Sequence, residues 1–383
     1  MPARKTVCMV VSSVELTAQW FLLGHIAAMA DLYDVYLVGN CRDTDYLRRQ
    51  GIPVDVLYVP IVREISLLSD LKALFILVAL FRKRKFDVIH SFTPKAGLLT
   101  MLAALLARNH VRAHTFTGQV WAARRGPGRF VLKTMDRLLA ACATHILVDS
   151  HSQMEFLLRE RVISKRKTSV LGSGSISGVD TDRFQPRQDV RDRMRAKLEI
   201  PMGATVFVYI GRLKRDKGIL DLATAFSQLS QSYANAYLIV VGPDEENLRL
   251  EIESRCATYA ESVRIVSQTS TLEDYMASAD VLCLPSYREG FGSVIIEAAA
   301  CGVPALASRI YGITDAIREG ETGIFHRAGD VGDLLSGMQL LARDQAKRIE
   351  MGKSARARAE ADFCSKNVTA ALLEYYRRRL LAL

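Results

Sequence analysis

A chain of 383 residues exceeds the usual size of a single hydrophobic core, so we expect two domains of ordinary size. Apolar residues make up 49% of the chain and charged residues 24%, which excludes an intrinsically disordered protein. The net charge of +10 is unevenly placed, because residues 1–165 hold 22 Lys and Arg against 13 Asp and Glu, whereas residues 166–383 hold 29 against 28. This excess is either a solubilising surface or a footprint for an anionic partner, nucleic acid or phospholipid.

Cysteine usage and the apolar segments set the expected compartment. The seven cysteines are scattered and never spaced as Cys-x-x-Cys, which indicates neither a disulfide framework nor a zinc site and fits a reducing compartment. The apolar run near the N-terminus is too short for a signal peptide. The longest apolar stretches, Leu71–Phe81 and Ala96–Ala107, fall short of the roughly 18 residues that span a bilayer. We therefore expect a cytoplasmic protein that does not cross a membrane.

Short apolar strands and helical stretches alternate along the first half of the chain. The predicted strands are Thr6–Val11, Asp34–Val38, Val54–Val59, Phe86–Ser91, Ala113–Phe116 and His145–Asp149. The predicted helices are Thr17–Ala30, Ser69–Lys85, Ala96–Arg108 and Phe130–Ala143. This alternation is typical of βαβ units that form a parallel sheet covered on both faces.

The second half repeats the pattern after a linker, Leu171–Pro186, that is rich in Gly, Ser and Asp. Its predicted strands are Thr205–Ile210, Ala236–Val241, Val263–Val266, Val281–Leu284 and Ala305–Ala307. Its predicted helices are Ile219–Leu229, Asn247–Thr258, Thr271–Ser278, Ser293–Cys301 and Asp333–Ala342. The sequence thus predicts two doubly wound α/β domains, in which ligands bind beyond the carboxyl ends of the strands.

Two glutamates eight positions apart follow one of the predicted strands of the second half. Glu289 precedes a glycine-bearing loop, and Glu297 lies about one turn into the helix that opens near Ser293. Gly290 and Gly292 allow the backbone to approach a ligand, and a helix start presents free N–H groups and a positive dipole end. We expect this loop to bind a diphosphate, while the two carboxylates accept hydrogen bonds from sugar hydroxyls beside it.

A basic loop, Gly211–Gly218, directly follows the predicted strand Thr205–Ile210 and so lies at the carboxyl edge of the sheet. Arg212 offers a planar fork for phosphate oxygens and Lys217 a compact charge. Cleavage of a sugar–phosphate bond builds negative charge on the departing diphosphate, which fixed cations stabilise most in the transition state. A basic loop alone is commonly a solvated turn, but together with the two glutamates it indicates a nucleotide-sugar site.

Together these segments resemble the retaining glycosyltransferases of family 4, which have the GT-B fold of two Rossmann-like domains facing each other across a cleft. The positions that match the family's motifs are Gly178, Val179, Asp180, Phe184, Gly211, Arg212, Lys217, Gly218, Ala279, Asp280, Pro285, Ser286, Glu289 and Glu297. The resemblance implies an acceptor-binding domain over residues 1–170 and a nucleotide-sugar-binding domain over residues 171–362. It also implies a C-terminal helix at 363–383 that packs back on the N-terminal domain.

The resemblance implies a role for each donor-site residue. Arg212 and Lys217 would hold the donor diphosphate, Glu297 would bind the nucleotide ribose, and Glu289 would bind the transferred sugar. The other residues of the donor site would be Gly211, Gly290, Phe291, Gly292 and Ser293, the last four cradling the sugar and the β-phosphate with their backbone.

The first half matches the family less closely. Ser12 and Ser13 stand where relatives often carry a glycine pair after the first strand, and Thr117 stands where many carry a histidine before a glycine. His114, three residues earlier, is either a substitute for that histidine near the reacting sugar or a structural residue of its strand. We keep Ser13 and Thr117 as candidate donor contacts and His114 as a candidate catalytic residue.

The resemblance also implies retention of the anomeric configuration. In a front-face displacement the leaving phosphate can take the proton of the acceptor, so no protein base is required. Neither Gly211–Gly218 nor Arg288–Pro304 contains an Asp-x-Asp pair of the kind that holds a metal against a diphosphate. Arg212 and Lys217 can replace Mg²⁺ as charge neutralisers, so we expect neither a metal nor another cofactor, and UDP is the expected nucleotide.

The basic first half bears on the acceptor. Its clustered cations are Arg82, Lys83, Arg84, Lys85, Arg108, Arg112, Arg124, Arg125, Arg129 and Lys133. With Phe81 and Phe130 as apolar neighbours, they predict peripheral contact with the inner face of the cytoplasmic membrane, although buried helix faces with solvated charges would look similar. Thr93–Gly97 and Thr115–Trp121 resemble a subgroup that builds bacterial surface polysaccharides, such as O-antigen or capsule, on lipid carriers. A polyprenyl-diphosphate-linked saccharide is thus the expected acceptor.

Three other functions stay open. The first is the same transfer to a soluble small-molecule acceptor. The second is a GT-B-like sugar-nucleotide isomerase, for which the chain offers no evident set of catalytic carboxylates or histidines. The third is a non-enzymatic binder of nucleotide sugars or nucleic acid, but no helix-turn-helix, RNA-binding motif or aromatic–basic interleaving is present, so we expect no nucleic-acid partner.

Overall fold

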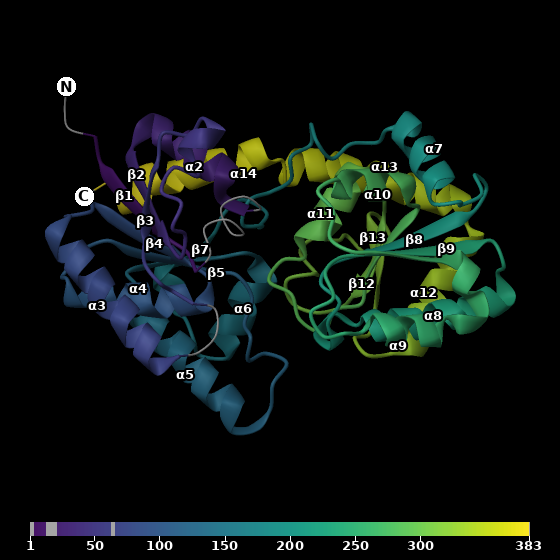
Figure 1. Cartoon of the computed structure of the whole chain (residues 1–383), viewed down its shortest axis with the longest axis horizontal. Coiled ribbons are helices and arrows are strands. Elements are labelled where there is room, and N and C mark those ends of the chain that lie inside the picture. Colours follow the sequence, from purple (N-terminus) through teal and green to yellow (C-terminus); the bar gives the residue numbers. More distant parts are fainter. Residues whose placement is uncertain (1–3, 13–20, 63–65, 383) are drawn as a thin grey trace. The chain divides into compact units, whose positions relative to one another are not determined.

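The computed structural model of the chain describes residues 4–12, 21–62 and 66–382. It divides into two compact units: unit 1 consists of residues 1–177 and 365–383, and unit 2 of residues 178–364. Each unit has a parallel sheet with helices on both faces (Figure 1). Within each sheet the first strand lies at the centre, the second and third follow on one side, and the fourth and later strands follow on the other. The prediction of two Rossmann-like α/β domains is confirmed.

The described part of unit 1 has a seven-stranded sheet in the order β3-β2-β1-β4-β5-β6-β7. Its strands are β1 (Thr6–Val10), β2 (Asp34–Gly39), β3 (Asp55–Tyr58), β4 (Val88–Phe92), β5 (Arg112–Phe116), β6 (His145–Val148) and β7 (Thr168–Val170). Its helices are α2 (Leu23–Leu32), η2 (Arg48–Gln50), α3 (Leu67–Lys83), α4 (Pro94–Leu106), α5 (Gly126–Cys142), α6 (His151–Arg159), η3 (Lys165–Lys167), α14 (Ser365–Tyr375) and η6 (Tyr376–Leu380).

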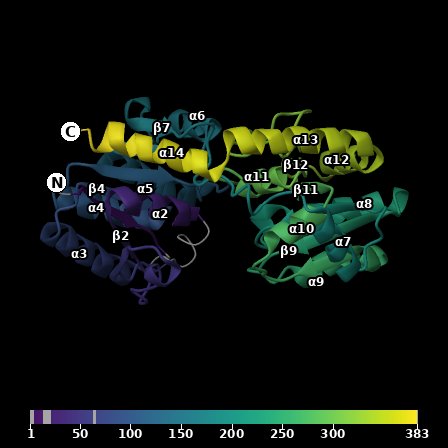
Figure 2. The ribbon, with the colours of Figure 1, turned by 90° about the horizontal axis from the view of Figure 1, so that it is seen from above.

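The two faces of this sheet carry different helices. Buried side chains of α3, α4, α5 and α6 form one apolar cluster, and those of α2 and the C-terminal α14 and η6 form another. Helix α14 lies beside α2 (Figure 2). The C-terminal segment is tied to unit 1 by buried polar contacts: the Nδ1 of His25 lies 2.8 Å from the Thr369 hydroxyl, and the Nδ1 of His90 lies 2.6 Å from the Tyr376 hydroxyl. The last helices of the chain are therefore an integral part of unit 1.

The described sheet of unit 2 has six strands in the order β10-β9-β8-β11-β12-β13. Its strands are β8 (Thr205–Ile210), β9 (Ala236–Val241), β10 (Val263–Val266), β11 (Val281–Leu284), β12 (Ala305–Ser308) and β13 (Gly323–His326). Its helices are α7 (Gln188–Lys197), η4 (Arg215–Lys217), α8 (Ile219–Ser232), α9 (Arg249–Arg255), η5 (Ala257–Ser262), α10 (Leu272–Ser278), α11 (Ser293–Ala300), α12 (Val331–Arg343) and α13 (Gln345–Asp362).

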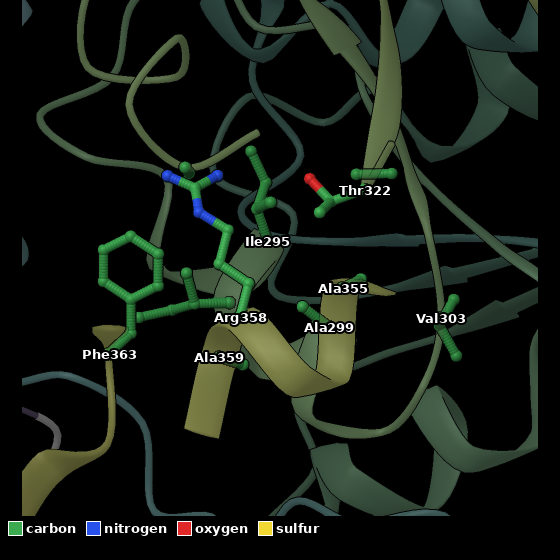
Figure 3. Close-up of a pocket in the computed structure, with 11 residues that line it drawn as sticks. Ile295, Ala299, Val303, Thr322, Ala355, Arg358, Ala359 and Phe363 are labelled. Atoms are coloured by element: carbon green, nitrogen blue, oxygen red, sulfur yellow. The ribbon is translucent and has the colours of Figure 1, made fainter. Parts of the chain in front are cut away.

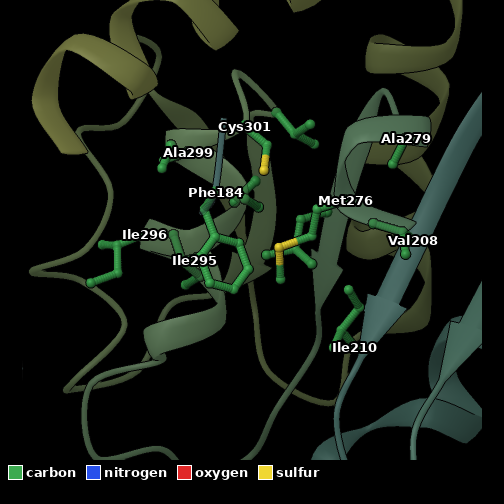
Figure 4. Close-up of a cluster of buried hydrophobic side chains, with 14 of the residues drawn as sticks. Phe184, Val208, Ile210, Met276, Ala279, Ile295, Ile296, Ala299 and Cys301 are labelled. Atoms are coloured by element: carbon green, nitrogen blue, oxygen red, sulfur yellow. The ribbon is translucent and has the colours of Figure 1, made fainter. Parts of the chain in front are cut away.

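The chain enters and leaves unit 2 at adjacent points. Val179 pairs with Cys364 in a parallel bridge, and its N–H donates to the carbonyl of Phe363 at 2.8 Å. Both Val179 and Phe184 are buried in a core cluster of unit 2, where Phe184 packs among side chains of α10 and α11 (Figure 4). The Asp180 carboxylate accepts the backbone N–H of Arg183 at 3.2 Å and so fixes the turn between them. The boundary between the units thus falls inside the predicted linker.

All seven cysteines are free thiols, six of them buried and Cys364 half-buried. No helix among the described residues is both long enough and apolar enough to cross a bilayer.

Candidate active site

Three loops meet at the carboxyl edge of the unit 2 sheet, because β9, β8 and β11 are neighbours. Glycines allow the loops to touch. A Cβ on Gly218 would lie 2.1 Å from the Pro285 carbonyl oxygen, and a Cβ on Gly242 would lie 2.0 Å from the Gly211 carbonyl oxygen. Since neither distance is sterically possible, any side chain there would separate the loops. The glycines therefore bring the basic loop after β8 against the glutamate loop after β11.

An ion pair joins these two loops. The ammonium of Lys217 lies 2.7 Å from Glu289 Oε1, and only 12% and 16% of the two side chains are exposed. The same Oε1 accepts the hydroxyl of Ser286 at 2.8 Å, and Lys217 also donates to the Arg288 carbonyl at 3.4 Å. Among the described residues, these contacts leave one N–H of Lys217 and the Oε2 of Glu289 without a partner. The pair thus keeps a donor and an acceptor for a ligand.

The charge of Arg212 acts on the same part of the sheet edge as that of Glu289, because both shift the pKa of Tyr209. Its guanidinium lies 3.3 Å from Glu245 and is 36% exposed, while its backbone carbonyl accepts the hydroxyl of Tyr209 at 2.8 Å. Burial raises the pKa of Tyr209, the carboxylates of Glu289 and Asp216 raise it further, and Arg212 lowers it. Tyr209 therefore stays a neutral donor that fixes the Arg212 backbone. The structure brings Arg212, Lys217 and Glu289 together around one sheet edge.

The loop after Glu289 leads into α11 through a left-handed residue, Gly292, with φ of 70°. A Cβ on Gly292 would contact Ile295, Leu284 and Ile313, so this glycine serves the turn and its packing. The side chain of Phe291 is 3% exposed and packs edge-on against Phe363, which leaves its backbone for a ligand. α11 has no side-chain cap, and the N–H of Ile295 donates to the Gly292 carbonyl at 2.8 Å. Among the described residues, the N–H groups of Ser293 and Val294 therefore stay available to an anion.

Glu297 lies in the second turn of α11 and is half-buried. Burial raises its pKa to about 7, while the charge of Arg183 lowers it and the charge of Glu273 raises it. Arg183 donates to Glu273 at 2.7 Å, so one guanidinium serves both glutamates electrostatically. The sequence did not predict Arg183, because its partner lies 90 positions away.

Other residues near the site hold its loops in place. Arg288 pairs with Asp216 at 3.0 Å, and the N–H of Tyr287 donates to the Asp216 carbonyl at 3.0 Å. Asp280, which matches a family motif, pairs instead with Arg195 of α7 at 2.8 Å and so anchors that helix. Among the described residues, no group of three or more His, Cys, Asp or Glu side chains is placed to hold a metal ion.

A small enclosed cavity of unit 2 lies between α11 and α13 and is separate from these loops (Figure 3). Apolar residues such as Ile295 and Phe363 line it, together with Arg358, whose buried Nη1 has no described partner. At about 10 Å³ it has room for about one water molecule, so it does not hold a sugar.

The unit 1 candidates lie in a different environment. His114 of β5 is fully buried, its Nδ1 lies 2.8 Å from the Ser91 hydroxyl, and its Nε2 has no partner among the described residues. Burial lowers its pKa to about 3, so the ring is neutral. A Cβ on Gly97 would lie 2.4 Å from the ring, which shows how tightly α4 covers it. Thr117 is half-buried just after β5, and Ser13 lies outside the described residues.

Two family models match the chain: "Glycosyl transferase 4-like domain" over residues 18–174 and "Glycosyl transferases group 1" over residues 190–358. The chain is 32% identical over 319 residues to the capsular polysaccharide biosynthesis glycosyltransferase CapM of Staphylococcus aureus, covering 83% of each protein. It is 26% identical over 334 residues to the UDP-Gal:α-D-GlcNAc-diphosphoundecaprenol α-1,3-galactosyltransferase of Escherichia coli, covering 85% of this chain and 84% of that one.

The fold is shared with solved structures. Anabaena HepE in complex with UDP and glucose superposes with a TM-score of 0.81 over 98% of this chain and all of that one, at 18% sequence identity. The chain therefore belongs to the group 1 and family-4-like glycosyltransferases of the GT-B fold and is itself a glycosyltransferase.

Proposed function

We propose that this glycosyltransferase moves a hexose or N-acetylhexosamine from a UDP-sugar to a polyprenyl-diphosphate-linked saccharide, or to another precursor of a surface polysaccharide, with retention and without a metal. The observation that carries the proposal is the contact of Lys217 with Glu289 beside the start of α11. The names of the two relatives support it, since one acts in capsule biosynthesis and the other takes UDP-galactose and an undecaprenyl-diphosphate acceptor.

The donor diphosphate fits the edge of the unit 2 sheet. The free N–H of Lys217, the half-exposed guanidinium of Arg212 and the uncapped N–H groups at Ser293 all offer hydrogen bonds to phosphate oxygens. Lys217 is held in place by Glu289 before the donor arrives, so little reorganisation accompanies the development of charge on the leaving group. Fixed cations of this kind supply the charge neutralisation that a metal ion gives elsewhere.

The two glutamates receive the sugar portions of the donor. Both contacts of the Glu289 carboxylate use Oε1, which leaves Oε2 to accept a hydroxyl of the transferred sugar. Glu297 would accept the ribose hydroxyls, and an approaching donor makes its ionised form more favourable because hydrogen bonds stabilise that form. The leaving β-phosphate takes the proton of the acceptor hydroxyl as the new glycosidic bond forms on the same face, which retains the configuration.

The test is a transfer assay with a panel of UDP-sugars and two acceptors: a short-chain polyprenyl diphosphate that carries one N-acetylhexosamine, and a soluble sugar phosphate. We expect product only with the prenyl-linked acceptor, with the anomeric configuration of the donor by NMR, and with the same rate in EDTA. Product only with the soluble acceptor would show that the acceptor is wrong. An inverted product, or a rate that EDTA abolishes and Mg²⁺ restores, would overturn the mechanism.

A further inference from the structure

Helix α3 buries an unusually narrow stripe. Its buried residues are only Ala73, Leu77 and Phe81, one per turn. The outward side is apolar as well, and its exposed large side chains, with their exposed fractions, are Leu67 (77%), Leu68 (84%), Leu71 (51%) and Phe75 (69%). An exposed stripe of this kind costs stability in water, because a soluble helix normally presents polar residues on that side.

Helix α5 carries a second exposed apolar stripe in the same layer. Its residues and exposed fractions are Phe130 (68%), Val131 (49%), Met135 (37%) and Leu138 (46%). Both helices pack against α4, which lies between them on one face of the unit 1 sheet (Figure 1). The end of α4 adds Leu105 and Leu106, which are also exposed. The α3–α5 face, defined as these ten residues, is therefore apolar across three neighbouring helices.

Unpaired cations border this face. The exposed Lys83, Lys85, Arg108, Arg124 and Arg125 lie at the ends of these helices and have no carboxylate partner among the described residues. They belong to a unit that holds 28 Lys and Arg against 14 Asp and Glu, whereas unit 2 holds 23 against 27. The positive charge of the protein is thus concentrated on the unit that carries the apolar face.

The structure corrects the sequence prediction about which residues form this surface. Arg129 and Lys133 share one carboxylate, that of Glu160, with Arg129 at 2.9 Å and Lys133 closer. Arg112 donates to the carbonyl of Cys142 at 2.7 Å. Phe81, expected as an apolar neighbour of the cations, is 1% exposed and belongs to the core. Apolar side chains on α3 and α5, rather than the cluster of cations alone, therefore dominate this surface.

We propose that the α3–α5 face inserts its apolar side chains into the headgroup region of an anionic lipid bilayer, with the bordering cations on the phosphates. A second copy of the chain fits this face less well, because two units of the same large positive charge would repel each other. Nucleic acid fits it less well, since leucine and phenylalanine stripes offer nothing to a phosphate backbone. The inference rests on the proposed function, because a bilayer is where a polyprenyl-linked acceptor is found.

The test is flotation of the full chain with phosphatidylglycerol-containing vesicles that hold no acceptor. We expect wild type to float with the vesicles and to remain partly bound in about 1 M NaCl. At this salt concentration the Debye length is about 3 Å, so the attraction between the cations and the anionic lipids is screened. The double variant Leu68→Gln/Phe75→Gln should lose about tenfold or more in vesicle affinity, since each large apolar side chain contributes at least that factor when it leaves water. Leu250→Gln, equally exposed at 78% but in unit 2, is the matched control and should bind as wild type.

The outcomes separate this inference from the proposed function. Wild-type affinity in the Leu68→Gln/Phe75→Gln variant, or complete release of wild type by salt, overturns insertion of the face. A wild-type dimer in sedimentation that the double variant abolishes assigns the face to a second copy instead. Transfer to the short-chain prenyl acceptor is measured in parallel and should be unchanged in the double variant. If wild type floats but transfers nothing to that acceptor, the proposed acceptor fails while the membrane surface stands.

Discussion

The carboxyl edges of the two sheets are built on the same strand order but hold their polar residues differently. In unit 2 the loop after the fourth strand, β11, presents Glu289 to Lys217 in a partly exposed ion pair. In unit 1 the fourth strand, β4, directs Ser91 toward His114 inside the core, where both are fully buried. A charged pair with an unused donor and an unused acceptor lies at the unit 2 edge, whereas Ser91 and His114 of unit 1 are neutral and bonded to each other inside the core.

This difference supports the proposed donor site in unit 2. Ionised groups are tolerated at the unit 2 edge because each is paired and still reaches solvent, whereas the interior of unit 1 keeps its histidines neutral by burial. A phosphate needs exposed donors, so topology alone does not make a donor site. The loops that follow the strands do.

Replacement of Lys217 by Met, which removes the cation at the carboxyl edge of the unit 2 sheet, should have the largest effect on activity. The change keeps the length of the side chain but removes the ammonium, and we expect kcat/KM to fall by about 10²–10³-fold, the usual cost of one transition-state donor. Steady-state transfer rates measure this. Lys214→Met is the matched control, because Lys214 lies in the same loop as Lys217. Lys214 pairs with Glu245 and Glu246 at 3.5 Å instead of with Glu289. Equal losses in both variants would mean that only the overall charge of the loop matters.

Gly218→Ala tests whether contact between the loops is required. The added Cβ would meet the Pro285 oxygen, so Lys217 must move, and displacements of about 1 Å can cost about 10²-fold in rate. We expect a loss of about 10-fold to 10²-fold in kcat/KM. Gly320→Ala is the control. Gly320 has the same left-handed backbone conformation as Gly218, with φ of 76° against 68°, but a Cβ there would meet no other atom. This variant should lose stability without losing activity, and an active Gly218→Ala enzyme would show that the loops need not touch.

Glu297→Gln measures how much the buried carboxylate of Glu297 lowers the stability of the fold when it is ionised. The folded pKa of about 7 lies above the value of 4.5 expected in the unfolded chain, so wild type loses stability as pH rises through about 7. The neutral amide does not titrate, and we expect the variant to gain about 1–3 kcal/mol relative to wild type between pH 5 and pH 8. Urea unfolding at both pH values measures it, with the exposed Glu253→Gln as control. A difference that does not change with pH would contradict the assignment.

His114→Leu is the mildest change expected for activity. Since the ring is buried and neutral, we expect turnover to stay within about twofold of wild type, as for residues that do not touch the reacting atoms. The folded pKa of about 3 lies below the ordinary 6.5, so His114 contributes stability above pH 6.5 that is lost as pH falls toward 3. The variant should therefore lose less stability than wild type between pH 7 and pH 5. A large fall in kcat with unchanged stability would instead make His114 catalytic.

The sequence predicted elements that are marked by a continuous apolar run. β8, β9 and β11 begin and end where the pattern indicated, because buried parallel strands are apolar almost throughout. β10 also has the predicted bounds, although it is only half-buried and contains Arg264. β7 was not predicted, since three residues give no periodicity, and neither was β13, which begins with a glycine. Helix α13 escaped prediction because most of its 18 residues are polar and only Met351, Gly352, Ala355 and Ala359 are buried. Polar helices that pack through small residues leave little signal in the sequence.

The candidate site was predictable where its residues follow strands. Lys217 and Glu289 were expected together because both come after neighbouring strands of one sheet, and their 2.7 Å contact agrees with that expectation. Arg183 was missed because it acts through tertiary packing from the inter-domain linker. A sheet covered on both faces predicts that a strand residue such as His114 is buried, but not that its ring bonds Ser91 and lies against Gly97 of α4.

The central claim is that the loops holding Lys217 and Glu289 bind the donor, and titration calorimetry with UDP tests it most directly. We expect wild type to bind UDP equally with and without EDTA, Lys214→Met to bind comparably, and Lys217→Met to lose at least tenfold in affinity. UDP binding by Lys217→Met that matches wild type, or binding by wild type that requires Mg²⁺, would contradict the claim.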